Sequence, residues 1–549
     1  MTDRPGRAAV VTGGGGGIGT AVAVELARRG IAVVAMDPGA GLQGEPLGEP
    51  TAEETARRIV AEGGVARAST ASVTDRDAVR SLFAEVVAEY GSLDIVVNTA
   101  GILRFAPFLQ ASEDDWRAVL DVHLNGYLNV LAEALPVMEA AGYGRIVGVT
   151  SGAGLARAAA DSAHYSCAKR AVAAVTWQLA GLLPEGVALN ALSPLAATRM
   201  VTGGRTRDGE RGRDGGVDLS GMPPTRDMAP IAAYLAGEEA GAFRGQVIFS
   251  AGPELSVISP PRLTEAVRTE ATTDFAASLD TLVPVVLGPA EAQQRSTGGS
   301  NARFGAVFDR PQTTGPAAGA SGARNCLVIS DDQALTRVLA PALARCGMTI
   351  VNLGAASLPA GFAAAREALG RAAQAAGGID AVVIAPGRFA APGPAPHTWP
   401  GTLAGYPATA GDVLAHASWL QAAAREAVRT SRPLRVVHLT DATSPPLRAG
   451  AQAVAQLARC AGLVQPELIE VFSIALETAE RADREPLAQL VARMLFAADA
   501  SALRGAEMFA RPGWLGIRSH PGPAATVSYG TPQVPSWVGD WLREAAPIR

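Results

Sequence analysis

The opening 250 residues repeat one local pattern, in which a short apolar run is followed by an amphipathic stretch. This alternation is typical of βα units, whose strands join into a parallel sheet with helices on its faces. The predicted strands are 8–12, 31–36, 65–69, 95–98, 145–150, 187–192 and 246–249. The predicted helices are 20–29, 52–62, 76–90, 113–141, 164–183 and 227–235. The pattern therefore predicts a doubly wound α/β sheet in the first half of the chain.

A second series of βα units follows and repeats some of the first. Its predicted strands are 326–330, 349–353, 381–385, 435–440 and 468–475, with Ala-rich helices between them. The segment DAVVIAPG at 380–387 parallels DIVVNTAG at 94–101, and LRVVHLT at 434–440 parallels GRIVGVT at 144–150. These parallels indicate an internal duplication at long period. We therefore predict an α/β fold of two tandem Rossmann-like, doubly wound parallel sheets, the second of them degenerate.

Changes in this pattern and in composition divide the chain into segments. Its length of 549 residues exceeds that of one ordinary domain. We assign residues 1–262 to a first domain, 263–323 to a connecting segment and linker, 324–520 to a second domain, and 521–549 to a Pro-rich tail that packs through Trp537 and Trp541. Residues 203–216 interrupt the first domain with glycines and charges, so we expect a mobile loop there.

The charge balance and the cysteines disfavour several classes of protein. The 47 basic and 52 acidic residues leave a net charge of −5, and binding to nucleic acid or a membrane surface would favour a basic face instead. No apolar run approaches the length of a membrane span. The four cysteines show no metal-ligand spacing, so we expect no metal and reduced thiols, as in a cytoplasmic protein.

A glycine-rich turn joins the first strand to the first helix. Gly13, Gly17 and Gly19 would let the backbone turn tightly and approach a pyrophosphate at the helix N-terminus. The turn could also be a plain flexible loop, but a strand precedes it, a helix follows it, and Asp37 ends the second strand. Asp37 is placed to accept hydrogen bonds from an adenosine ribose, unless it merely begins a turn with Pro38. Because a carboxylate repels the 2′-phosphate of NADP, we expect NAD as the cofactor.

Ser151, Tyr165 and Lys169 form a second constellation. Ser151 follows the fifth strand, at the sheet edge where ligands bind, and a helix would place Tyr165 and Lys169 on one face because they are four residues apart. A free tyrosine has a pKa of about 10, which a nearby ammonium lowers. Tyr165 could then exchange a proton with a substrate oxygen that Ser151 binds. Lys169 is the only lysine in the chain; the alternative to a catalytic role is an ordinary surface lysine.

These residues together resemble the short-chain dehydrogenase/reductase family over roughly residues 7–252. The matching motifs are the glycine-rich segment 12–19, NTAG at 98–101, Ser151, the pair Tyr165 and Lys169, and residues 193–198. The resemblance implies hydride transfer with a nicotinamide cofactor. It implies cofactor contacts or support from Gly13, Gly17, Ile18, Gly19, Asp37, Ser72, Val73, Asn98, Ala100, Gly101, Tyr165, Lys169, Pro194 and Thr198.

A finer resemblance is to the (3R)-hydroxyacyl-CoA dehydrogenase part of peroxisomal multifunctional enzyme type 2. It lies in residues 100–116, 121–126 and 143–147 and in the long insertion after Asp37, and it implies NAD and a 3-hydroxyacyl thioester.

The chain departs from the family pattern at three positions. His123 stands where most members place a catalytic Asn; it either takes part in the proton relay or is a satisfied core histidine. Ala71 replaces an Asp that usually contacts adenine, and Leu195 replaces a Gly beside the nicotinamide.

The second half lacks this chemistry. At the position of the glycine-rich turn it reads Ser-Asp-Asp-Gln over 330–333, and two carboxylates there would repel a pyrophosphate. The helix around 450–462 contains neither tyrosine nor lysine. We interpret this half as a degenerate copy with a structural role, although a different activity through His438 and Asp441 stays open. Long helices such as 113–141 and 164–183 commonly pair subunits in this family, so we predict an internal pseudo-dimer that further assembles into homo-oligomers.

The leading functional hypothesis is an NAD-dependent oxidoreductase acting on a secondary alcohol or ketone, which a thioester could carry. The alternatives are a biosynthetic reductase of a polyketide-like or cyclic ketone, and a non-catalytic NAD-binding scaffold. Arginines in the 203–216 loop could grip the phosphates of coenzyme A, but acidic residues interleave with them and favour a solvated loop. These arginines are Arg205, Arg207, Arg211 and Arg213.

Overall fold

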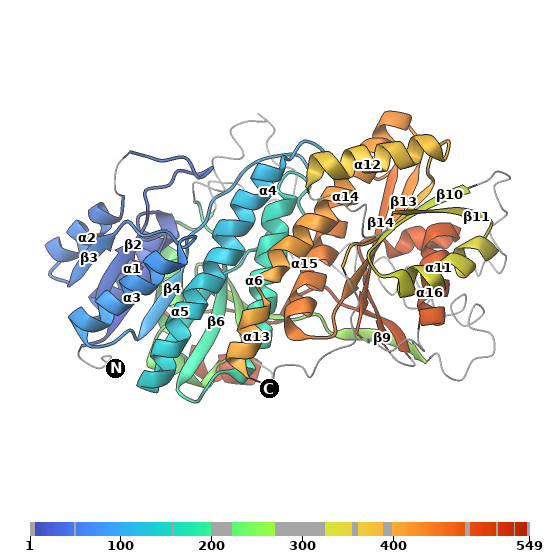
Figure 1. Ribbon diagram of the computed structural model, residues 1–549. Helices are drawn as coiled ribbons and strands as arrows, with labels where there is room; N and C mark the ends of the chain where they lie inside the picture. Colours follow the sequence, from blue (N-terminus) through green and yellow to red (C-terminus); the bar gives the residue numbers. More distant parts are fainter. Residues whose placement is uncertain are drawn as a thin grey trace.

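The computed structural model shows two α/β units side by side, with helices from both units between the two sheets (Figure 1). It describes residues 6–48, 51–155, 157–198, 222–268, 324–353, 361–387, 398–477, 484–511, 514–531 and 533–545. The predicted loop at 203–216, with its arginines, and most of the predicted linker lie outside these residues. No helix in the described ranges combines the length and apolar character that a membrane crossing requires.

The first half forms a nine-stranded sheet in the order β17-β8-β7-β6-β5-β4-β1-β2-β3, counted over the described residues. Its strands are β1 (Ala8–Thr12), β2 (Ala32–Met36), β3 (Ala66–Ser69), β4 (Ile95–Asn98), β5 (Gly144–Val149), β6 (Val187–Pro194), β7 (Val247–Ala251), β8 (Glu254–Ser259) and β17 (Gly522–Ser528). Strands β1 to β7 pair in parallel, while β8 and β17 are antiparallel additions at one edge. The strand order reverses between β1 and β4, and ligands of such sheets bind at that reversal.

The helices of the first half follow the predicted pattern with one interruption. They are α1 (Gly17–Arg28), α2 (Thr51–Ala61), α3 (Arg76–Tyr90), α4 (Glu113–Leu120), α5 (Gly126–Ala141), α6 (Ala163–Leu179) and α8 (Ala229–Leu235). The predicted helix over 113–141 is helical throughout but contains a π-helical turn, Asp121–Asn125, between α4 and α5. Such a turn holds an extra residue, and π-helical turns often occur at functional sites. It carries His123.

The second half forms an eight-stranded sheet in the order β11-β10-β12-β13-β14-β15-β16-β9, again counted over the described residues. Its strands are β9 (Leu263–Arg268), β10 (Arg324–Ser330), β11 (Met348–Leu353), β12 (Ala381–Ala385), β13 (Leu434–Asp441), β14 (Ile469–Leu476), β15 (Glu507–Arg511) and β16 (Trp514–Arg518). Its helices are α11 (Gln333–Arg345), α12 (Phe362–Ala375), α13 (Trp399–Gly405), α14 (Ala408–Thr430), α15 (Pro445–Ala461) and α16 (Arg484–Phe496), and α17 (Val538–Ala545) follows near the C-terminus. Two Rossmann-like sheets in tandem confirm the predicted fold class.

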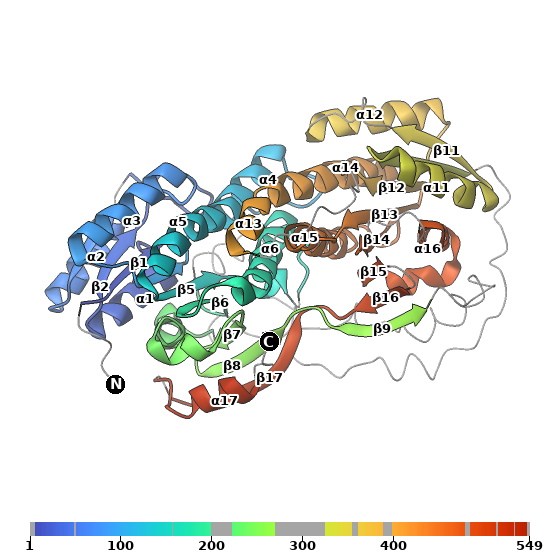
Figure 2. The same ribbon diagram turned by 60° about the horizontal axis from the view of Figure 1, so that its bottom comes forward.

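The two halves exchange edge strands. Strand β9 directly follows β8 in the chain, yet it pairs with β16 in the second sheet. Strand β17 returns from the second half and pairs with β8 in the first sheet. Figure 2 shows β9 and β17 running in opposite directions between the two units. The segments expected to be a connection and a tail thus each supply a strand to the other half.

Helix α17 completes the return of the C-terminal segment to the first half. Its Val538 and Leu542 are buried in the core that α1 and α8 share. Trp541 packs against the same core, whereas Trp537 is 44% exposed. Of the two tryptophans expected to anchor this segment, only Trp541 lies against the core.

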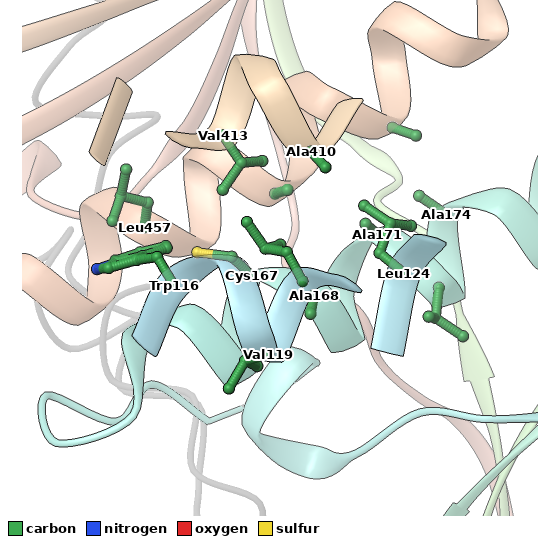
Figure 3. Packing of buried hydrophobic residues seen from close by; sticks show 14 of the residues in the cluster. Trp116, Val119, Leu124, Cys167, Ala168, Ala171, Ala174, Ala410, Val413 and Leu457 are labelled. Carbon is green, nitrogen blue, oxygen red and sulfur yellow. The ribbon is translucent and has the colours of Figure 1, made fainter. Parts of the chain in front are cut away.

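Four helices join the halves through a continuous apolar core. Helices α4 and α6 of the first half pack against α14 and α15 of the second. Figure 3 shows Trp116 and Cys167 on one side of this contact with Val413 and Leu457 on the other. Because α6 also carries Tyr165 and Lys169, the second half packs directly on the helix that holds the candidate catalytic pair.

Candidate active site

The glycine-rich turn after β1 requires glycine for steric reasons. Gly13 has a φ of +66°, and a side-chain carbon on it would lie 2.9 Å from the Cα atom of Ala100. A side-chain carbon on Gly19 would lie 2.1 Å from the carbonyl oxygen of Gly13. The turn therefore brings bare backbone to the N-terminus of α1, where Gly17 and Ile18 line an open cleft. Backbone N–H groups at a helix N-terminus are suited to hold an anionic phosphate group.

Asp37 lies beside this turn at the end of β2. Its carboxylate accepts hydrogen bonds from the backbone N–H of Gly15 (3.2 Å) and of Gly39 (2.8 Å). Both interpretations of Asp37 thus have a structural counterpart, since it begins a turn and also lines the cleft. Neither contact removes its charge.

The predicted adenine and nicotinamide contacts lie along the same cleft, with one exception. Ser72, Val73, Ala100, Gly101, Pro194 and Thr198 all line it, and so does Ala71. Asn98 is buried beneath the cleft, where its side-chain oxygen accepts a hydrogen bond from Thr12 Oγ1 at 2.7 Å. Leu195 donates its backbone N–H to the carbonyl of Ser250 and is not among the lining residues. The structure places Asn98 as a support of the central strands.

Ser151, Tyr165 and Lys169 converge at the carboxyl end of β5. Burial raises the pKa of Tyr165, and a hydrogen bond with Ser151 acts in the opposite direction. The Nζ atom of Lys169 lies 5.7 Å from the centre of the Tyr165 ring and donates to the carbonyl of Val149 at 2.7 Å. Burial lowers the pKa of Lys169 to about 7. The three side chains sit where one substrate oxygen could reach both the Ser151 and Tyr165 hydroxyls.

Two local features bring α6 close to β5. Thr150 Oγ1 donates to the carbonyl of Lys169 at 2.7 Å. A side-chain carbon on Gly154 would lie 2.5 Å from the backbone nitrogen of Arg170. The backbone after Ser151 can therefore pass against α6 only because residue 154 is glycine.

His123 lies against Tyr165. Its ring centre is 5.1 Å from that of Tyr165, at an interplanar angle of 89°. Its Nε2 atom lies 2.6 Å from the carbonyl oxygen of Ile102 and 3.1 Å from the backbone nitrogen of the same residue. Because a carbonyl only accepts and an N–H only donates, the tautomer of the ring decides which of the two contacts is a hydrogen bond. Burial, followed by the charge of Lys169, lowers the pKa of His123 well below its ordinary value, so the ring is neutral near pH 7. Its Nδ1 atom has no hydrogen-bond partner among the described residues.

The glycine-rich turn, Asp37, Ser151, Tyr165, Lys169 and His123 line one cleft of about 800 Å³, a size typical of a small-molecule or cofactor site. The insertion after Asp37 also lines it, through Pro38 to Leu42, Gly44 and Pro46. Its Leu42 carbonyl accepts from the N–H of Leu103 at 2.7 Å, so the insertion reaches across to the substrate end. The sequence showed the insertion, but no local pattern revealed where it folds.

The second half fills its equivalent turn with its own carboxylate. Asp332 is the N-cap of α11 and accepts hydrogen bonds from the N–H groups of Ala334 (2.8 Å) and Leu335 (3.0 Å). These are the kind of N–H groups that would otherwise bind a phosphate. His438 is buried against His416, with their Nδ1 atoms 2.9 Å apart, and Asp441 accepts from Thr443. These contacts favour a structural role for this half.

Comparison with known proteins agrees with this geometry. A family model described as short chain dehydrogenase matches residues 7–208. The hydroxyacyl-CoA dehydrogenase ChsB1 of Mycobacterium tuberculosis is 32% identical over 277 residues, which cover 48% of this chain and 82% of that protein. An acetoacetyl-CoA reductase of Allochromatium vinosum is 33% identical over 240 residues, covering 44% of this chain and 94% of its own. A peroxisomal hydratase-dehydrogenase-epimerase of Neurospora crassa is 35% identical over 197 residues, which are 36% of this chain and 22% of that protein. The chain therefore belongs to the short-chain dehydrogenase family of oxidoreductases.

Proposed function

We propose that the first half binds NAD and transfers a hydride between it and a secondary alcohol or ketone. The observation that carries this proposal is the convergence of Ser151, Tyr165 and Lys169 at one end of a cleft whose other end holds the glycine-rich turn and Asp37. Gly13 and Gly19 line the cleft with bare backbone at the N-terminus of α1, which fits a pyrophosphate. When bound there, NAD would supply the hydride acceptor or donor.

The protein's own residues would handle the proton. Tyr165 would give a proton to the substrate oxygen in reduction and take it back in oxidation, while Ser151 holds that oxygen by a hydrogen bond. Lys169 uses one N–H on Val149, which leaves two more donors on its ammonium. Its charge would favour the phenolate of Tyr165 and offset the effect of burial. With its proton on Nε2, His123 would offer Nδ1 as an acceptor in place of the Asn that most of the family has there.

The preference for NAD over NADP rests on the carboxylate of Asp37. A 2′-phosphate near it would meet like charge, which costs binding free energy. The test is to titrate wild-type protein and Asp37→Ser with both cofactors. We expect the wild type to bind NAD more tightly, and the variant to gain affinity for NADP. Equal affinities for the two cofactors in the wild type would contradict the proposal.

The substrate class that we propose is a 3-hydroxyacyl or 3-oxoacyl thioester. The names of the relatives from Mycobacterium tuberculosis and Allochromatium vinosum refer to hydroxyacyl-CoA and acetoacetyl-CoA. The test follows NADH absorbance at 340 nm with 3-hydroxyacyl-CoA thioesters, free secondary alcohols and cyclic ketones. Turnover of cyclic ketones alone would favour the biosynthetic ketoreductase instead.

Replacing Tyr165 by Phe separates an enzyme from an NAD-binding scaffold. The change removes the hydroxyl and keeps the ring against His123. We expect kcat to fall by about 10²–10⁴-fold, while NADH binding stays within a small factor. If the variant performs the protein's role in its host unchanged, the scaffold is the better explanation.

We further propose that residues 324–520 stand where a second subunit would pack against residues 1–262. The packing of α4 and α6 on α14 and α15 supports this pseudo-dimer. Expression of residues 1–262 alone tests it: a soluble, stable and fully active fragment would contradict the proposal. Homo-oligomers of the whole chain and a cytoplasmic location stay predictions; the four free thiols support the latter.

A further inference from the structure

Two loops border the substrate end of the cleft. The β4–α4 loop, residues 102–111, contributes Ile102 and Arg104 to its wall, and the β5–α6 loop, residues 152–162, directly follows Ser151. The loops pair with each other through their backbones. The N–H groups of Ala106 and Phe108 donate to the carbonyls of Asp161 and Ala160, both at 3.0 Å. The β5–α6 loop therefore packs on the β4–α4 loop, and among the described residues of the two only those of the β4–α4 loop line the cleft.

A glutamine of the second half holds the β4–α4 loop. Gln421 of α14 is 3% exposed, and its Nε2 atom donates to the carbonyls of Phe108 (2.7 Å) and Ala111 (2.8 Å). Next to it, Arg425 donates to the carbonyl of Leu109 at 2.8 Å. Because the Gln421 side chain is shielded from water, its loss would leave the two carbonyls without an easy replacement partner.

A second glutamine holds the β5–α6 loop in the same way. Gln456 of α15 is 1% exposed, and its Nε2 atom donates to the carbonyls of Ala153 (2.7 Å) and Arg157 (2.6 Å). Arg459 donates both to Gln456 Oε1 and to the carbonyl of Leu155, each at 2.9 Å. The contact with Arg459 orients the amide, because a guanidinium can only donate.

The loops connect these glutamines to the reacting groups. Ile102 lies in the β4–α4 loop, where its carbonyl oxygen and its backbone nitrogen both contact Nε2 of His123, and His123 lies against Tyr165. The β5–α6 loop directly follows Ser151, whose hydroxyl lies near enough to Tyr165 to lower the pKa of that phenol. A shift of either loop would therefore move a group that touches Tyr165.

We propose that Gln421 and Gln456 are positioning residues for the active site, through which the non-catalytic half holds Ser151 and His123 in register with Tyr165. This inference rests on the proposed oxidoreductase function. It gives the second half a role in turnover, beyond covering an apolar face. Neither glutamine touches the cleft, so both would act only through the loops.

The test uses Gln421→Met, Gln456→Met and the double variant in the full chain. Methionine keeps the length of the side chain and removes the donors. The matched control is Tyr406→Phe, which removes another hydrogen bond between the halves, from Tyr406 Oη to Gln178 Oε1 at 3.2 Å, and touches neither loop. The readouts are kcat and KM for the best substrate, the Kd for NADH, the thermal midpoint, and amide hydrogen exchange of the two loops.

We expect each Met variant to lower kcat/KM by about tenfold, with a larger share in kcat, because the reacting groups lose their alignment. The NADH Kd should stay within about twofold, since the glycine-rich turn is untouched. Exchange should accelerate in residues 102–111 for Gln421→Met and in 152–157 for Gln456→Met. Tyr406→Phe should lower the thermal midpoint while leaving kcat/KM and both exchange rates unchanged.

Two results would overturn the inference: wild-type kcat/KM in both Met variants, or a loss of activity that Tyr406→Phe reproduces at equal loss of stability. If the wild type turns over no substrate, the proposed function fails, and exchange alone then decides whether the glutamines hold the loops. If a Met variant does not fold, Gln456→Asn keeps the amide but withdraws it by one methylene, and the same criteria apply to it.

Discussion

A buried ion pair joins α6, the helix of the candidate catalytic pair, to the second half, and its removal yields a quantitative prediction. Arg170 follows Lys169 on α6, is fully buried, and donates from Nη2 to Glu507 Oε1 at 2.5 Å. His520 Nδ1 lies 2.9 Å from the same oxygen. Burial alone would raise the pKa of Glu507, but Arg170 and His520 hold it below its ordinary value. Burial lowers the pKa of His520 to about 4, so at pH 7 it is a neutral donor.

Glu507→Gln keeps the shape of the side chain and deletes the charge that compensates Arg170. Breaking one side of a buried ion pair costs about 3–5 kcal/mol, because the remaining charge is stranded. We expect a loss of that size in the free energy of unfolding, measured by urea denaturation of the full chain at pH 7. The double variant Arg170→Met/Glu507→Met should recover most of it, since paired apolar replacements are often neutral.

A loss below about 1 kcal/mol for Glu507→Gln, the level of an exposed pair, would refute the reasoning. So would a double variant that is less stable than the single one. A matched control is Glu367→Gln, which removes the exposed partner of Arg371 on α12. We expect that change to alter the free energy of unfolding by no more than about 0.5 kcal/mol.

Three further predictions follow from burial and close contacts. Burial lowers the pKa of five histidines, which are His123, His164, His416, His438 and His520. The pKa falls to about 4 for His164 and to about 3 for His416. Because the pKa values in the folded state lie below the unfolded value, lowering the pH below about 6.5 should reduce the free energy of unfolding. The expected loss is about 1.4 kcal/mol per histidine and per pH unit. A urea midpoint that is unchanged between pH 6.5 and pH 5.5 would contradict this. Lys169→Met should lower kcat/KM by at least about 100-fold. It should also raise the thermal midpoint, because an ammonium is costly to bury and burial lowers the pKa of Lys169 to about 7. A lower thermal midpoint would contradict this explanation. Gly19→Ala should weaken NADH binding at least about tenfold in a fluorescence titration, because the new methyl group would lie 2.1 Å from the Gly13 carbonyl oxygen. The control Gly370→Ala in α12, where the space around residue 370 is open, should leave NADH binding unchanged.

Features set by local rules could be predicted from the sequence. The spacing of Tyr165 and Lys169 places both on one helix face whatever surrounds them. Residues 13 and 19 must be glycine because a side-chain carbon at either position would clash with nearby backbone atoms. The strands β1 to β7 and β10 to β14 likewise follow from apolar runs of strand length. These parts of the fold and the composition of the cleft needed no knowledge of distant contacts.

Features set by distant contacts could not be predicted. The His123 ring in the π-helical turn contacts Ile102, 21 residues away in the chain, and a periodicity of 3.6 residues does not show an inserted residue. Gln421 and Gln456 resemble any polar residues on an Ala-rich helix, because the carbonyls that they bind lie about 300 residues away in the chain. Strands β9 and β17 pair with the opposite half, a choice that depends on which sheet edges are open.

The exchange of β9 and β17 has a consequence for how the protein is made. Strand β8 is synthesised early, but its neighbour β17 comes much later; Ser259 and Gly522, which bond across the two strands, are 263 residues apart. At about 5–20 residues per second, the ribosome exposes the β8 edge for tens of seconds before β17 emerges. An open strand edge invites pairing with other chains. A product interrupted before residue 514 thus exposes an unpaired strand edge, and both sheets are complete only after β16 and β17 have emerged.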